Sequence, residues 1–81
     1  MDQRIAVIGV VLSDRKNAAG RVNDILSEYG DIIVGRMGIP YRERNLSVIS
    51  LIVDGDTDQI GAMTGKLGRI PGVKVRSAFT L

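Results

Sequence analysis

The sequence predicts an α+β fold in which strands and helices follow one another in the order βαββαβ. Strand-like apolar runs alternate with helix-like periodicity, and the pattern strand–helix–strand occurs twice along the chain. Because crossovers are right-handed, this order gives a ferredoxin-like sandwich: an antiparallel four-stranded sheet, order 4-1-3-2, with two helices on one face. A length of 81 residues suits one domain, so we expect residues 1–81 to form a single unit.

The first third of the chain predicts a buried strand followed by a helix. Residues 4–12 (RIAVIGVVL) are β-branched and almost wholly apolar, which is typical of a strand covered on both faces. Ser13 or Asp14 then caps a helix over residues 15–29, which Gly30 is expected to end in the left-handed conformation. The apolar positions of this helix fall on one face: Ala18, Val22, Ile25, Leu26 and Tyr29.

Two strands joined by a short polar connection are predicted next. Residues 31–39 (DIIVGRMGI) form the second strand, and we expect Pro40 to stop it because proline cannot donate a ladder hydrogen bond. Residues 41–45 (YRERN) form the connection, and residues 46–53 (LSVISLIV) form the third strand.

The last third of the chain predicts a helix and a final strand. Asp56 or Thr57 caps the helix, whose apolar residues recur at spacings of three and four, and a Pro-Gly pair at residues 71–72 ends it. Residues 73–81 alternate between apolar and polar side chains, which predicts the fourth strand.

The two central strands of this sheet are apolar on both faces, although two helices on one side cover only one face. The side chains that line the open face are either Ala6, Ile8 and Val10 or their alternates Ile5, Val7 and Val11. A lone domain rarely exposes a contiguous apolar patch of more than a few hundred Å². We therefore expect a homo-oligomer, a dimer or a tetramer, in which another copy covers this face.

The composition excludes several function classes. The chain has no Cys and no His, which excludes thiol chemistry, disulfides, zinc-finger sites and His-based acid–base catalysis. We expect no catalytic residue, no metal and no cofactor. A net charge of +2 is too small to indicate nucleic-acid binding by itself. The chain shows no membrane span and no signal-peptide pattern, so a cytoplasmic location is expected.

Three stretches of the chain resemble a known family: residues 22–26 (VNDIL), 36–40 (RMGIP), and 60–68 (IGAMTGKLG) running into 71–75 (PGVKV). Together they resemble the small regulators of the iron-only hydrogenase system, which are ACT-like domains similar to the C-terminal domain of the nickel-responsive regulator. The resemblance implies a regulatory, ligand-sensing or protein-interaction module. It does not imply nickel sensing, because the nickel-responsive regulators bind metal through His and Cys, which this chain lacks.

The turn between the first strand and the first helix is the candidate ligand site. Ligand-binding ACT domains usually carry Asp-Arg-Pro-Gly there, whereas this chain has Asp14 and Arg15 followed by Lys16 and Asn17. A helix N-terminus presents free N–H groups to carboxylate or phosphate, so Ser13, Asp14, Arg15 and Asn17 are the predicted contacts of a small anionic effector. The alternative is an ordinary capped helix start.

Other charged or glycine-rich groups have simpler interpretations. The arginines around the second hairpin (Arg36, Arg42 and Arg44, beside Tyr41) are either an anion or nucleic-acid site or a solvated loop. Lys74 and Arg76 are expected to guard an edge strand. The glycines at 61, 65 and 68 lack the pattern of a phosphate loop and predict close packing against the sheet or another subunit. The acidic residues at 54, 56 and 58 predict a capping turn and not a calcium loop.

Two other functions compatible with this fold stay open. An acyl phosphate-handling enzyme would need a phosphate cradle in the first turn, where Arg15 and Asn17 are present without the glycine-rich loop. An RNA-binding module would need aromatic side chains on the central strands, and those strands contain none.

Overall fold

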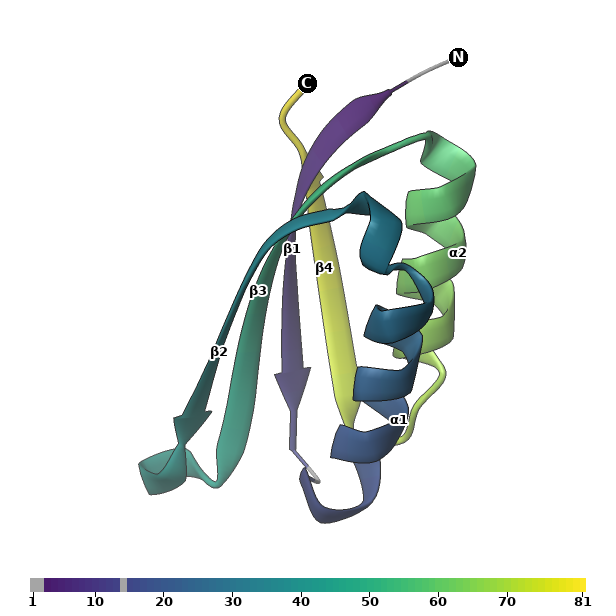
Figure 1. Ribbon diagram of the computed structural model, residues 1–81. Helices are drawn as coiled ribbons and strands as arrows, with labels where there is room; N and C mark the ends of the chain where they lie inside the picture. Colours follow the sequence, from purple (N-terminus) through teal and green to yellow (C-terminus); the bar gives the residue numbers. More distant parts are fainter. Residues whose placement is uncertain (1–2, 14) are drawn as a thin grey trace.

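The computed structural model describes residues 3–13 and 15–81 of the chain and contains a four-stranded sheet with two α-helices on one side (Figure 1). The elements follow in the order β1 (Arg4–Leu12), α1 (Arg15–Glu28), η1 (Gly30–Ile32), β2 (Ile33–Tyr41), η2 (Arg42–Arg44), β3 (Leu46–Gly55), α2 (Thr57–Gly68) and β4 (Val73–Phe79), in which η denotes a 3-10 helix. The sheet order is β2-β3-β1-β4, with antiparallel neighbours throughout. The predicted ferredoxin-like topology, order 4-1-3-2, is therefore confirmed.

The core lies between the sheet and the helices. Alternate residues of β1 point into it and are fully or almost fully buried: Ala6, Ile8, Val10 and Leu12. The predicted apolar face of α1 packs over them through Ala18, Val22 and Leu26, while α2 contributes Ile60, Met63 and Leu67. Within the described residues no polar or charged residue is buried, so the core needs no internal polar partners.

The start of α2 is fixed by side-chain hydrogen bonds. The Asp56 carboxylate accepts from the backbone N–H of Gln59 at 2.7 Å, and the Gln59 side chain accepts from the backbone N–H of Asp56 at 3.0 Å. This reciprocal pair is a capping box, which satisfies two N–H groups that a helix start leaves free. The capping interpretation of the acidic turn is confirmed.

Two sequence expectations about where elements end are wrong. Pro40 does not stop β2, because the strand continues to Tyr41 and Pro40 pairs with Ser47 of β3. β2 lies at the edge of the sheet, where a residue whose nitrogen points outward can lack an N–H without losing a ladder hydrogen bond. Gly30 does not take the left-handed conformation either; among the described residues only Asn45 and Gly72 have positive φ, at 54° and 81°.

The first and last strands lie side by side, and the described ends of the chain contact each other (Figure 1). The backbone N–H of Thr80 donates to the Ile5 carbonyl at 2.9 Å, and Arg4 Nε donates to the Leu81 carbonyl at 2.8 Å. The Arg4 guanidinium also lies 4.6 Å from the centre of the Phe79 ring.

Neither helix in the described part of the chain is long and apolar enough to cross a membrane.

Candidate functional site

The face of the sheet opposite the helices, here called the open face, carries large apolar side chains. The strand pairing places Val7 of β1 beside Ile52 of β3, and Ile39 of β2 beside Val48 of β3, on this face. The exposed fractions of its large residues in the single chain are 40% for Val7, 60% for Met37, 54% for Ile39, 43% for Tyr41 and 46% for Ile52. The structure thus selects the set Ile5, Val7 and Val11 as the open-face side chains of β1.

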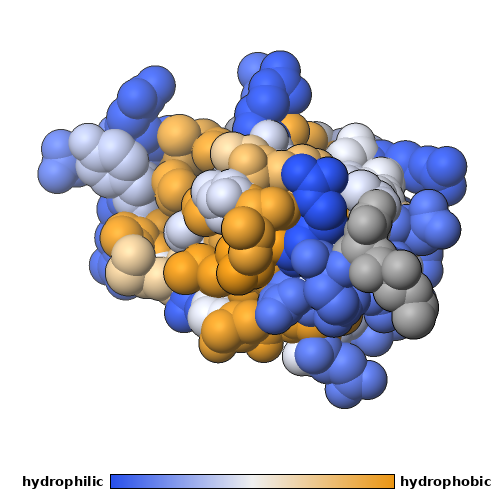
Figure 2. Space-filling view, turned by 90° about the horizontal axis from the view of Figure 1, so that it is seen from above, coloured by the Kyte–Doolittle hydropathy of each residue, from blue (hydrophilic) through white to orange (hydrophobic). Residues whose placement is uncertain are grey.

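Charged groups on the open face lie at its margins. Lys74 and Arg76 project from the edge strand β4, and Asp54 lies at one end of β3. The side chains in the middle of the face are short, because Gly9 of β1 lies directly opposite Ser50 of β3. Figure 2 shows that, seen from above, hydrophobic residues gather in one continuous area with hydrophilic residues around it.

Of the predicted ligand site in the first turn, the structure describes two of the four side chains. The backbone N–H of Ser13 donates to the Gly72 carbonyl at 2.8 Å, and the Ser13 hydroxyl donates to the same oxygen at 3.0 Å. Asn17 is exposed in the first turn of α1. Asp14 and the side chain of Arg15 lie outside the described residues. The four-residue site therefore stays a prediction.

A hollow of about 370 Å³ opens beside this first turn. Its lining joins the turn to the open face: Val11, Ser13, Leu46, Gly72, Val73 and Lys74. The sequence predicts Lys74 only as a charged residue that protects the edge of the sheet, yet Lys74 borders the same hollow as Ser13. The register of β4 against β1, which pairs Lys74 with Val11, brings the two together, and this pairing is not visible in the sequence.

A second groove, between α1 and β2, is crossed by a hydrogen bond between two of the stretches that carry the family resemblance. Arg36 Nη2 donates to the Asn23 side-chain oxygen at 2.8 Å. The groove has a volume of about 210 Å³, and its walls include Val22, Pro40 and Ile49. Arg36 therefore points to the helix side of β2, away from Arg42 and Arg44 in the η2 turn, and the structure does not gather these three arginines into one site.

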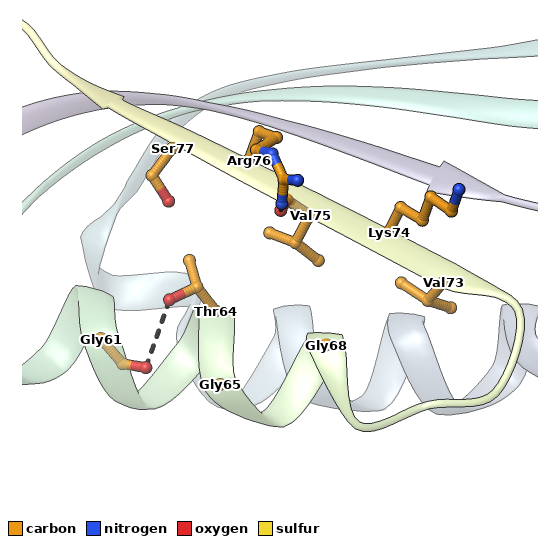
Figure 3. A pocket seen from close by; sticks show the side chains of 9 residues that line it. All are labelled: Gly61, Thr64, Gly65, Gly68, Val73, Lys74, Val75, Arg76 and Ser77. Atoms are coloured by element: carbon orange, nitrogen blue, oxygen red, sulfur yellow. Dashed lines mark hydrogen bonds between the residues drawn. The ribbon is translucent and has the colours of Figure 1, made fainter.

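The third groove lies between α2 and the edge strand β4 and has a volume of about 550 Å³ (Figure 3). One wall is the face of α2 that carries Gly61, Thr64, Gly65 and Gly68, and the other is β4 from Val73 to Ser77. A Cβ atom added at any of the three glycines would meet nothing within 4 Å. Packing against the sheet is therefore excluded for these glycines, since they border open space, while the alternative of packing against another subunit stays a prediction.

The two helices are joined on the surface by Lys66 of α2. Its Nζ atom lies 2.7 Å from the Glu28 carboxylate of α1, and 5.0 Å from the centre of the Tyr29 ring. The hydrogen bond to Glu28 raises the pKa of Lys66 above its ordinary value of 10.5, and a hydrogen bond with Tyr29 acts in the same direction. No group of three or more acidic side chains that could hold a metal ion occurs among the described residues.

Comparison with known proteins adds to this geometry. A model of the TM1266-like family, described as "Iron-only hydrogenase system regulator, putative", matches residues 4–77. The chain belongs to this family. The solved structure of the uncharacterized protein TM1266 from Thermotoga maritima is 38% identical to this family member, with a TM-score of 0.95; the match covers 99% of this chain and 100% of that chain. No curated protein matches this chain.

Two less similar structures support the ACT-like fold of this member of the regulator family. The ACT domain of the GTP pyrophosphokinase of Chlorobium tepidum is 18% identical, with a TM-score of 0.79; the match covers 95% of this chain and all of that domain. The regulatory subunit of aspartate kinase from Thermus flavus is 20% identical, with a TM-score of 0.57; the match covers 96% of this chain and 57% of that one. At these identities the likeness concerns the fold alone.

Proposed function

We propose that this chain, as one ACT-like domain over residues 1–81, is a homo-oligomeric regulatory module in which two copies pack through their open faces. The observation that carries the proposal is the continuity of apolar side chains across β2, β3 and β1, from Met37 and Ile39 through Val48 and Ile52 to Val7. The family to which the chain belongs supports a regulatory role, linked to the iron-only hydrogenase system.

The free energy available from covering this face is substantial. Full burial of a large aliphatic or aromatic side chain stabilises by roughly 1.5–3 kcal/mol. Because the exposed fractions here are about half, each such side chain would contribute about half of that amount when it is covered. Sheets that pack face to face lie about 10 Å apart and interdigitate their side chains. Because Gly9 has no side chain and Ser50 has a short one, the middle of the open face leaves room for side chains of the other copy.

The charges at the margin favour one arrangement of the two copies. A two-fold axis perpendicular to the strands would place β4 over β4, with Lys74 and Arg76 of the two copies facing each other. An axis along the strands places β4 of one copy over β2 of the other, where Met37 and Ile39 are apolar and Tyr41 is aromatic. Since like charges in contact are unfavourable, the second arrangement is the one we propose.

The effector part of the proposal concerns the first turn. A small anion would bind at Ser13, Asp14, Arg15 and Asn17, where α1 begins, with the Lys74 ammonium supplying positive charge across the adjacent hollow. Val11, Leu46 and Lys74 line this hollow and also belong to the open face. An anion bound there would lie at the border of the proposed interface, where it could change the stability of the oligomer.

We propose that the chain is not an enzyme and does not bind nucleic acid directly. The family to which the chain belongs favours a regulator over an enzyme. On the open face, the central strands β1 and β3 carry aliphatic side chains, serine, glycine and, at one end of β3, Asp54. None of these offers an aromatic ring on which a base could stack.

The test is the oligomeric state of a matched pair of variants. Val7 lies on the open face and its neighbour Ile8 is fully buried under the helices. We expect the wild-type chain to be a dimer or tetramer at low micromolar concentration in size-exclusion chromatography with light scattering. Val7→Glu is expected to be a folded monomer, whereas Ile8→Glu is expected to unfold, because a buried unpaired charge is strongly destabilising.

Ala62→Glu on the exposed side of α2 is the surface control and is expected to keep the wild-type mass. A wild-type chain that stays monomeric at this concentration contradicts the proposal. So does a Val7→Glu variant that is folded and keeps the oligomeric mass.

A further inference from the structure

The outer edge of β4 is free to accept another strand. The N–H and C=O of one residue point to the same side of an antiparallel strand, and successive residues alternate. The Gly72 carbonyl accepts from Ser13, and the Thr80 N–H donates to Ile5, so the even-numbered residues of this segment bond to β1. The odd-numbered residues Val75 and Ser77 therefore direct their backbone groups away from the sheet, toward the groove beside α2.

One side chain already occupies this edge. Arg76 Nη1 donates to the Val75 carbonyl at 3.1 Å, so the guanidinium folds over the outside of β4 and lines the groove (Figure 3). A single bond from an exposed guanidinium to a neutral backbone carbonyl is readily exchanged for a carboxylate, because a carboxylate carries the opposite charge and can accept two parallel hydrogen bonds from arginine. Arg76 thus covers the edge in the free chain and offers a ready partner to an acidic side chain.

The β4 wall of the groove is positively charged, because Lys74 and Arg76 project from it. Lys66 and Arg69, at the C-terminal end of α2, border a neighbouring hollow. Lys66 is paired with Glu28, while no salt bridge occupies Lys74, Arg76 or Arg69 within the part of the chain that the structure describes. The opposite wall is not blocked, because the glycine face of α2 leaves space beside Val73 and Val75.

We propose that this groove binds an extended segment of a partner protein in which acidic and apolar residues alternate, added to the sheet as a fifth strand beside β4. Side chains of an added strand alternate between the two faces of the sheet. Those on the open-face side would lie next to Lys74 and Arg76 and are acidic. Those on the helix side would lie over Gly61, Gly65 and Gly68, where there is room for apolar side chains.

A second copy of this chain is a poorer occupant of the same edge. Two β4 strands paired antiparallel about a two-fold axis bring Lys74 and Arg76 of one copy close to those of the other, and like charges on neighbouring strands are destabilising. The acidic partner strand removes this repulsion. The open-face interface would also contact Lys74 and Arg76, so the two proposals share these side chains. The backbone edge of β4 and the glycine face of α2 belong to the groove alone.

The test uses a synthetic peptide of about seven residues, the length of an ordinary strand, in which Glu alternates with Val. We expect it to shift the backbone amide resonances of Val75, Ser77 and Gly65 in two-dimensional NMR titrations of the full chain. Replacing every Glu by Lys is expected to abolish these shifts. Raising the salt concentration is expected to weaken binding, because exposed charges are screened.

Variants of the chain test whether the peptide binds in the groove or is only attracted by positive charge elsewhere on the surface. Gly65→Leu fills the groove, and Gly20→Leu is its matched control, since Gly20 is an exposed helical glycine with open space around it on α1. We expect Gly65→Leu and Arg76→Glu each to weaken binding at least tenfold, with Gly20→Leu and Arg42→Glu close to wild type. Leucine is a better helix former than glycine, so Gly65→Leu should remain folded.

The proposal is overturned if the Glu peptide gives no shifts at millimolar concentration, or if the Lys peptide binds as well. It is also overturned if Gly65→Leu binds like the wild type, or if the shifts fall on Val7 and Ile52 of the open face. A wild-type chain that proves to be monomeric but still binds the Glu peptide in the groove would contradict the open-face proposal alone.

Discussion

The side-chain oxygen of Asn23 accepts a hydrogen bond from Arg36 at 2.8 Å, which joins the middle of α1 to the edge strand β2. Both residues are exposed. The contact holds one wall of the α1–β2 groove to the other, and it connects two of the three stretches by which the sequence resembles its family.

Removal of either partner is expected to cost a modest amount of stability. Asn23→Ala or Arg36→Met should each lower the free energy of unfolding by about 0.5–1 kcal/mol, since hydrogen bonds at exposed positions contribute little. Urea unfolding of both single variants and the double variant measures the coupling, which should be a few tenths of a kcal/mol. Arg42→Met, in the exposed η2 turn, is the control and should be neutral. Strict additivity of the two changes would contradict the contact.

The capping box of α2 gives a larger expected effect. Asp56→Ala removes the acceptor for the Gln59 N–H and should destabilise the protein by about 1 kcal/mol. Asp56→Asn keeps a side-chain oxygen in place and should stay within a few tenths of a kcal/mol of the wild type. Thermal unfolding of the two variants compares them directly, and equal losses would contradict the prediction that a side-chain oxygen at position 56 is what stabilises the start of the helix.

The ion pair between Lys66 and Glu28 should make stability depend on pH in the alkaline range. The pKa of Lys66 is raised in the folded chain, so its contribution is fully present below 10.5, its ordinary value, and is lost as the pH rises through the raised pKa. The melting temperature of Glu28→Gln should therefore lie below that of the wild type at neutral pH and approach it well above pH 10.5. Asp24→Asn on the same helix is the control. A gap that stays constant over this range would contradict the prediction.

Anion binding at the first turn can be followed with inorganic phosphate as the probe. We expect phosphate to shift the NMR resonances of Ser13, Asn17 and Lys74, because these groups surround the start of α1 and the adjacent hollow. Lys74→Met should weaken the response several-fold, while Arg44→Met should not change it. Shifts confined to Arg42 and Arg44, with the first turn unaffected, would reject this placement.

The last prediction is that the chain has no acyl phosphate-hydrolysing activity. The chain has no His or Cys, and Arg15 and Asn17 are not set in a glycine-rich phosphate cradle. We expect no hydrolysis of benzoyl phosphate above the rate of the buffer alone. Hydrolysis that disappears in Arg15→Ala would identify the chain as an enzyme.

The sequence was sufficient to predict the order of the elements and the order of the strands, because strand and helix periodicities differ clearly in this chain. It could not decide which side of β1 faces the helices, since Ile5, Val7 and Val11 are as apolar as Ala6, Ile8 and Val10. Only the placement of α1 and α2 over the sheet separates the buried set from the exposed one. The predicted end of β2 at Pro40 is wrong for a related reason, because the number of hydrogen bonds lost at a proline depends on whether its strand lies at the edge of the sheet.

The site was less accessible to sequence analysis. The contact between Asn23 and Arg36 and the proximity of Ser13 to Lys74 join residues that are distant along the chain, and both depend on strand register. The glycines of α2 suggested close packing because glycine is costly within a helix, by about 1 kcal/mol relative to alanine. Within the single chain the structure shows no element packed against this helix face, and no local pattern distinguishes a glycine that packs against the sheet from one that borders open space.

The pairing of β1 with β4 also bears on how quickly the chain folds. Contacts such as Val7 with Ala78 join residues near opposite ends of the sequence, so almost the whole chain must be looped before they form. Folding slows as such distant contacts increase. Because the two strands already end side by side, a circular permutant that links residue 81 to residue 4 and opens the chain in the η2 turn would make this pairing local. Stopped-flow refolding should then show the permutant folding faster than the natural order.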